Sequence, residues 1–205
     1  ILTIVFGVGS GVLMAVKKDR MLDHVLGTFS TVALSVPGFW IAIVLIFIFA
    51  EQWKILPSSG ISDGSGFILP AITLALPSIG VCARLTRSAI LDEIGRQYMT
   101  VADAKGMSRR RAVIRHAFGN ALIPIITYLG NHMAGIIGGA SIVETIFAIP
   151  GIGSYAIAGV QSKDYYVVQA YVLFSGCIYV LTNILIDLIY IALDPKIRAG
   201  EAVES

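Results

Sequence analysis

Charged residues are scarce in this sequence. They make up 14% of its 205 residues, whereas 56% are hydrophobic and the mean hydropathy is +0.82. Ordinary soluble domains hold about 25% charged residues, so this composition is typical of a membrane protein instead. The formal net charge of +2 is too small for the basic surface that nucleic-acid binding needs, and we expect no nucleic-acid partner.

The sequence is also poor in the residues that make redox, metal or catalytic sites. Cys82 and Cys177 lie far apart in apolar runs with no second ligand nearby, so we interpret both as small apolar side chains. No Ser/His/Asp or Cys/His set suggests a catalytic centre. No G-x-x-x-x-G-K-[ST] phosphate-binding loop occurs either, so we predict that the chain is not an enzyme and holds no cofactor of its own.

Long apolar runs are what the sequence does contain. A helix rises about 1.5 Å per residue, so about 20 apolar residues cross a hydrocarbon core about 30 Å thick. Lipid offers the backbone no hydrogen-bond partners, which makes each run a helix. We predict an all-α polytopic membrane protein with five spans, at residues 1–16, 25–50, 67–83, 121–143 and 165–193. The first is interpreted as truncated, and an earlier span is expected to precede it.

The positive charges predict how these spans are oriented. Thirteen of the fifteen Lys and Arg residues fall in alternate connections, at 17–20, 84–115 and 196–198, and only Lys54 and Lys163 lie in the others. Positive residues accumulate on the cytoplasmic side of membrane proteins. We therefore expect the long basic loop and the C-terminus to be cytoplasmic.

The basic loop keeps a helical pattern after the third span. Apolar residues recur among charges over residues 88–100, and Asp92 and Arg96 have the i, i+4 spacing that supports a helix face. Gly106 suits the end of a helix and Ser108 the start of the next. The arginines at 109–111 fall where the helix dipole disfavours cations. Anionic lipid headgroups explain them, and an acidic protein partner is the alternative.

Two strings in this loop resemble a known family. Thr100-Val101-Ala102-Asp103-Ala104-Lys105-Gly106-Met107-Ser108 is followed by Arg115-His116-Ala117-Phe118-Gly119-Asn120-Ala121-Leu122-Ile123-Pro124. Together they are similar to the EAA loop of ABC importer permeases, most of all to the peptide, nickel and opine branch. Thr100 stands where the general pattern has Glu, as is usual in that branch. Blocks at 35–40, 56–57, 68–71, 143–153 and 193–198 extend the resemblance over essentially the whole chain.

The resemblance implies a type I ABC importer permease bundle. Residues 1–205 would be one transmembrane domain with a cytoplasmic EAA coupling loop at 84–120, in a bacterial or archaeal cell membrane. The implied partners are two ATP-binding subunits, which hold ATP and Mg²⁺, a homologous but non-identical second permease, and an external substrate-binding protein. The contact with the ATP-binding subunits would be the coupling segment: Thr100, Val101, Ala102, Asp103, Ala104, Lys105 and Gly106. The substrate would be a small peptide, nickel or a metal chelate.

Polar and small residues in the fourth span suggest a translocation path. Asn131, His132 and Met133 are the candidates. His132 and Met133 could contact a metal in transit, and the alternative is a hydrogen-bonded histidine between helices beside an apolar methionine. Gly135 and Gly139 have the spacing of a close helix contact.

Residues 144–164 are too apolar for a solvated loop, and we expect a short interfacial or re-entrant element that turns at 150–153. Its first residue, Glu144, is expected to accept hydrogen bonds from that turn, with contact to the substrate-binding protein as the alternative. An ion-coupled transporter or channel is the competing function. It would show inverted repeats or charges within the spans that carry the coupling ion, and only Asp187 is plainly charged within a span.

Overall fold

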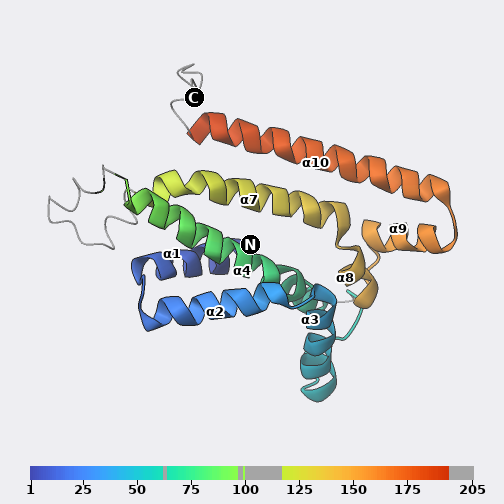
Figure 1. The fold of residues 1–205 in the computed structure, drawn as a ribbon. Coiled ribbons are helices and arrows are strands. Elements are labelled where there is room, and N and C mark those ends of the chain that lie inside the picture. The colour runs from blue at the N-terminus through green and yellow to red at the C-terminus, as the bar shows by residue number, and fades with distance from the viewer. Residues whose placement is uncertain (62–63, 97–98, 100–116, 194–205) are drawn as a thin grey trace.

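The computed structural model describes residues 1–61, 64–96, 99 and 117–193, except for the side chains of 137–139 and 190–193. Within these residues all regular structure is helical, as predicted. Figure 1 shows α2, α4, α7 and α10 side by side with similar axes, while α3 crosses this direction near one end. In chain order the elements are η1 (Thr3–Val8), α1 (Gly9–Val16), α2 (Met21–Ser35), α3 (Gly38–Leu45), η2 (Ile46–Gln52), η3 (Gly64–Phe67), α4 (Ile68–Ile94), α7 (Phe118–Gly139), α8 (Ser141–Ile146), α9 (Ile152–Gln161) and α10 (Tyr165–Leu193).

Helix α4 is the centre of the bundle, and glycines let two neighbours approach it closely. A Cβ added to Gly11 of α1 would lie 2.5 Å from the Cβ of Thr86, and one added to Gly80 of α4 would lie 2.6 Å from the carbonyl oxygen of Ser30 in α2. Close backbone approach of this kind drives helix association in lipid, where burial of apolar surface adds little.

The corresponding contact of α7 lies at Gly130. A Cβ there would clash with the side chain of Ile186 in α10, whereas a Cβ added to Gly135 would have no described atom within 4 Å. The described residues therefore do not make the close contact expected at Gly135. α7 nevertheless lies inside the bundle, between α4 and α10.

The range 25–50 is not one straight helix, which corrects the sequence prediction. α2 ends at Ser35, and the pair formed by α2 and α3–η2 is bent by 100°. Val36 and Pro37 have extended backbones, with ψ angles of 127° and 137°. A proline ring disfavours the helical conformation of the residue before it and removes one donor. Pro37 therefore ends α2 and redirects the chain.

The third predicted span is longer than 67–83, because α4 continues to Ile94 through Arg84 and Arg87. Its 27 residues extend about 40 Å, more than a hydrocarbon core requires. The expected pairing of Asp92 with Arg96 is not made. Arg96 lies beyond the end of the helix, and its Nη2 is 3.0 Å from Oε1 of Glu93 instead.

Helices occupy all five ranges in which spans were predicted. Among the described residues, 64–94 and 165–189 are each long and apolar enough to cross a membrane, and the bent pair of α2 with α3–η2 qualifies if counted as one. Thr3–Val16 is a shorter apolar helix. α7 has 22 residues, and the predicted range 121–143 divides at Ala140 into α7 and α8.

Candidate functional site

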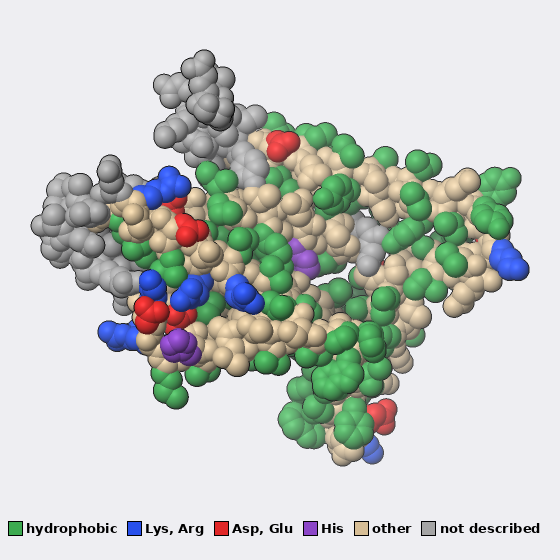
Figure 2. Space-filling view, in the orientation of Figure 1, with side chains coloured by type: hydrophobic (Ala, Val, Ile, Leu, Met, Phe, Trp, Pro, Cys, Tyr) green, Lys and Arg blue, Asp and Glu red, His purple; other side chains and the backbone are tan. Residues whose placement is uncertain are grey.

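Most of the described charges gather at one end of the bundle. This basic end holds the 17–20 turn, the C-terminus of α4 and the N-terminus of α7, and Figure 2 shows blue and red side chains clustered there. The coupling segment 100–106 lies outside the described residues, and so do Arg109, Arg110 and Arg111. The chain on either side of it is described.

The two ends of this connection meet at a buried carboxylate. Glu93, at the end of α4, is 7% exposed and accepts a hydrogen bond of 3.1 Å from Nδ2 of Asn120, in the first turn of α7. Glu93 also pairs with Arg96. An apolar cluster from the same region supports this contact: Ala15, Ile90, Met99, Ala117, Ala121 and Ile125. Helices α1, α4 and α7 are therefore held together where the connection between α4 and α7 begins and ends.

A second ion pair joins α2 to α4 at the basic end. Asp23 is 4% exposed and accepts two hydrogen bonds from Arg87, of 2.7 Å from Nε and 2.8 Å from Nη2. The backbone N–H of Asp19 donates a third, at 3.0 Å. Asp19 has a φ of 61°, a left-handed conformation that Asp adopts more readily than most residues. The tight α1–α2 turn thus orients the carboxylate toward Arg87.

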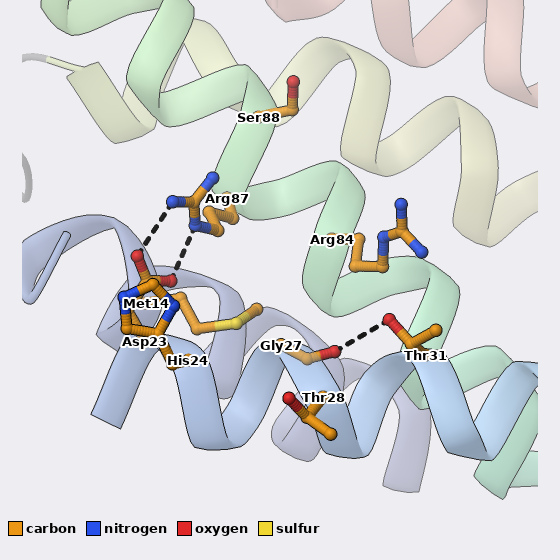
Figure 3. Close-up of a pocket in the computed structure, with 9 residues that line it drawn as sticks. All are labelled: Met14, Asp23, His24, Gly27, Thr28, Thr31, Arg84, Arg87 and Ser88. Carbon is orange, nitrogen blue, oxygen red and sulfur yellow. Dashed lines mark hydrogen bonds and ion pairs between the residues drawn. The ribbon is translucent and has the colours of Figure 1, made fainter. Parts of the chain in front are cut away.

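An open cleft of about 580 Å³ lies beside this pair. Met14 of α1 contributes to its floor, and the rest of the lining comes from α2 and α4: Asp23, His24, Gly27, Thr28, Thr31, Arg84, Arg87 and Ser88. Figure 3 shows both bonds between Arg87 and Asp23, whereas no interaction is drawn to the guanidinium of Arg84. Among the described residues that line the cleft, Arg84 is the arginine without a hydrogen bond or ion pair.

The three path candidates do not share one face of α7. Successive residues of a helix are turned by about 100°, so Asn131 and Met133 lie on opposite flanks of His132. His132 packs toward α4. Its ring stacks on Tyr128 at 5.8 Å and Nδ1 is 3.4 Å from the hydroxyl of Ser78. Nε2 is buried and has no hydrogen-bond partner among the described residues. Asn131 and Met133 are exposed.

At the other end of the bundle, α8 and α9 form a helical turn over the range predicted to be interfacial or re-entrant. Oε2 of Glu144 accepts a hydrogen bond of 2.8 Å from the backbone N–H of Ser154, in the first turn of α9. That N–H has no partner within the helix, and the cap residue Gly151 has no side chain to supply one. The predicted bond from Glu144 to the turn is confirmed, one residue beyond the expected range.

The remaining candidates add no chemistry to the site. Cys82 is buried and Cys177 is exposed, and neither forms a disulfide. Over the described ranges, no three His, Cys, Asp or Glu side chains are grouped so that they could hold a metal ion. Neither Asp23–Arg87 nor Glu93–Asn120 was found from the sequence, because the partners are 64 and 27 residues apart.

Comparison with known proteins identifies the family. Residues 7–199 match the model described as the binding-protein-dependent transport system inner membrane component. The chain belongs to this permease family. The resemblance of the EAA-like strings to this family is thereby confirmed.

Relatives of the chain within this family are named for the transport of peptides or glutathione. The chain is 39% identical over 97% of its length to a probable peptide ABC transporter permease of Sinorhizobium fredii. It is 34% identical over 95% to the glutathione transport system permease of Escherichia coli strain K12, and 34% over 97% to the dipeptide transport system permease of Bacillus subtilis. The chain spans 64–66% of the length of these relatives.

A solved structure has the same fold as this permease. The MetNI methionine ABC transporter, in an inward-facing conformation, matches with a TM-score of 0.75 over 94% of this chain and 88% of the other, at 16% sequence identity. At that identity the likeness concerns the fold alone. The predicted type I permease bundle is confirmed.

Proposed function

We propose that this chain is the transmembrane permease subunit of an ATP-driven importer of small peptides. The observation that carries the proposal is the family match over residues 7–199, together with relatives named for peptide, glutathione and dipeptide transport. Nickel and metal chelates are the other substrates that the sequence suggested. None of the three relatives compared above carries a metal in its name, so we favour peptides.

We assign the contact with two ATP-binding subunits to the coupling segment, residues 100–106. ATP and Mg²⁺ would be held by those subunits and not by this chain. The buried Glu93 and the apolar cluster around Ala117 and Met99 fasten both ends of the connection to α1, α4 and α7. A displacement of the loop would therefore move three helices together, which suits a subunit that alternates between two states.

We place the basic end in the cytoplasm, because most Lys and Arg residues are expected on that side. The opposite end, with α8, α9 and the Glu144 contact, would face an external substrate-binding protein. A second, homologous permease subunit would complete the path. Within the candidate set, Asn131 is exposed and polar and suits that path, while His132 is better explained as a contact between α7 and α4.

The test is ATP hydrolysis by the assembled complex in proteoliposomes. The full-length permease would be reconstituted with its genomic-neighbour permease, ATP-binding subunits and binding protein, and hydrolysis measured with a dipeptide, glutathione or Ni²⁺. We expect stimulation by a peptide and none by Ni²⁺. Stimulation by Ni²⁺ alone would reverse the substrate assignment. Uptake that proceeds without any ATP-binding subunit would identify an ion-coupled transporter and overturn the proposal.

A further inference from the structure

Helix α2 exposes two faces of opposite chemistry. Val25, Phe29 and Val32 recur at i, i+4 and i+7, and each is more than half exposed. A different face, also exposed, carries polar side chains at i, i+4, i+7 and i+11: His24, Thr28, Thr31 and Ser35. The apolar face suits contact with lipid. Polar side chains at membrane depth normally face protein or water, so the second face has another environment.

The polar face of α2 borders the cleft at the basic end. Thr28 and Thr31 line it from α2, and Arg84 and Ser88 line it from α4. Asp23, the carboxylate of the lining, is already bound bidentately to Arg87. The cleft therefore has an uncompensated positive charge at Arg84, a side chain that is always ionised.

The hydroxyl groups of this face are arranged to accept hydrogen bonds. Thr31 donates its proton to the carbonyl oxygen of Gly27 at 3.0 Å, and Ser35 donates to that of Thr31 at 2.8 Å. Each hydroxyl oxygen keeps lone pairs that can accept from water or from an N–H group. An arginine beside hydroxyl acceptors is suited to a molecule with a carboxylate and N–H donors.

The position of Arg84 along α4 fits the inner part of a membrane path. Arg84 is sixteen residues after the first residue of α4, Ile68, which corresponds to about 24 Å along the helix. If α4 begins at the outer edge of a core about 30 Å thick, Arg84 lies near the inner edge. A substrate leaving toward the cytoplasm would pass it last.

We infer that the polar face of α2, with Arg84 and Ser88 of α4, lines the water-filled inner part of the translocation path. The guanidinium of Arg84 binds the free carboxylate of the peptide there. This inference rests on the proposed peptide-import function and adds the residues that recognise the substrate on its way out. Arg87, one turn further along, does not take part because Asp23 occupies its guanidinium.

Accessibility of single cysteines tests whether the face is wet. Cys82 and Cys177 would both be replaced by serine in the full-length permease, assembled with its partner subunits in inside-out vesicles. Thr28→Cys and Thr31→Cys would then be labelled with a small water-soluble thiol reagent. The matched controls, Phe29→Cys and Val32→Cys, each follow one of the threonines by one residue, about 1.5 Å along the same helix, and lie on its apolar face. We expect labelling of the threonine positions at least tenfold faster. Equal rates would mean that lipid or a partner subunit covers the polar face, and would overturn the inference.

The charge of Arg84 is tested with the same cysteines. An anionic and a cationic thiol reagent of similar size would be compared at Thr31→Cys, with and without Arg84→Gln. Arg84 and Thr31 line the same cleft, and the charge of Arg84 acts oppositely on the two reagents. Arg84→Gln should therefore lower the ratio of anionic to cationic labelling by about fivefold. Arg87→Gln is not a suitable control, because it leaves Asp23 without its partner. Arg84→Lys is used instead, since it keeps the positive charge and should preserve the ratio of anionic to cationic labelling. An unchanged ratio in Arg84→Gln would contradict the assignment.

Substrate recognition is tested by protection of the Thr31 cysteine. A dipeptide added from the cytoplasmic side reaches the cleft without a binding protein, and it should slow labelling at Thr31→Cys more than its C-terminal amide does. Arg84→Gln should abolish that difference. Equal protection by both peptides with Arg84 present would show that no carboxylate is bound. ATP-driven uptake is measured in parallel with wild-type proteoliposomes that hold ATP in the lumen and have the binding protein outside: its absence refutes the proposed function, whereas normal uptake with no acid–amide difference refutes only the role of Arg84.

Discussion

Removal of Arg87 should destabilise the permease more than removal of its partner. Asp23 has a side chain that is 5% exposed, whereas Arg87 is 32% exposed. Arg87→Gln leaves a buried carboxylate with only the N–H of Asp19, while Asp23→Asn leaves a guanidinium that can turn toward the open cleft. Truncating one partner of a fully buried pair costs about 3–5 kcal/mol. Since water reaches Arg87, we expect about 2–3 kcal/mol for Arg87→Gln and about 1 kcal/mol for Asp23→Asn.

A double-mutant cycle separates this ion pair from general damage. The combined variant has no unpaired charge, so its loss should be smaller than the sum of the two single losses by about 1–2 kcal/mol. Arg84→Gln is the matched control. Arg84 lies one turn earlier on the same helix and forms no hydrogen bond or ion pair with the described residues, so the substitution should change stability by less than about 0.5 kcal/mol.

The assay is equilibrium unfolding of the full-length permease variants in mixed detergent micelles, monitored by far-ultraviolet circular dichroism. Additive losses in the double variant, or an Arg84→Gln loss as large as that of Arg87→Gln, would refute the reasoning. Either result would mean that the bidentate contact with Asp23 does not carry the stability assigned to it.

Three further predictions concern other contacts. Gly11→Leu should prevent close approach of α1 to α4 and lower the yield of folded permease severalfold by size-exclusion chromatography, whereas Gly135→Leu, in open space within this chain, should leave folding of the single subunit unchanged. Glu144→Gln weakens the bond to the N–H of Ser154 and should cost about 1 kcal/mol in the same unfolding assay; a loss below the measurement error would show that water replaces the bond. Glu93→Gln should leave ATP hydrolysis in place but reduce peptide uptake per ATP at least threefold; an unchanged ratio would mean that this contact does not transmit motion.

Helices in the five predicted ranges could be predicted because their cause is local. Twenty apolar residues in a row form a helix in lipid whatever surrounds them, and α10 coincides with the predicted range 165–193. The break at Pro37 also had a local signal, since proline disfavours a helical residue before it. The end of α4 had no such signal. Hydrogen bonding along a helix continues past charged residues, so Arg84 and Arg87 do not mark its C-terminus.

The candidate cleft depends on contacts that no local pattern shows. Arg84 and Arg87 are three residues apart on one helix and are indistinguishable in the sequence, yet only one of them meets Asp23. The distinction is made by the α1–α2 turn, which fixes the carboxylate against Arg87. Glu144 was predictable because its acceptor role follows from a helix start only ten residues away.

The central claim is that the coupling segment, residues 100–106, couples peptide uptake to the ATP-binding subunits. The most direct test is to measure peptide uptake when this segment is altered. The full-length permease, wild type or Gly106→Trp, would be reconstituted with all partner subunits, and dipeptide uptake measured together with ATP hydrolysis. We predict ATP-dependent uptake by the wild type and loss of uptake in Gly106→Trp, although the variant still folds and pairs with the second permease. Undiminished uptake by Gly106→Trp would contradict the coupling role of residues 100–106.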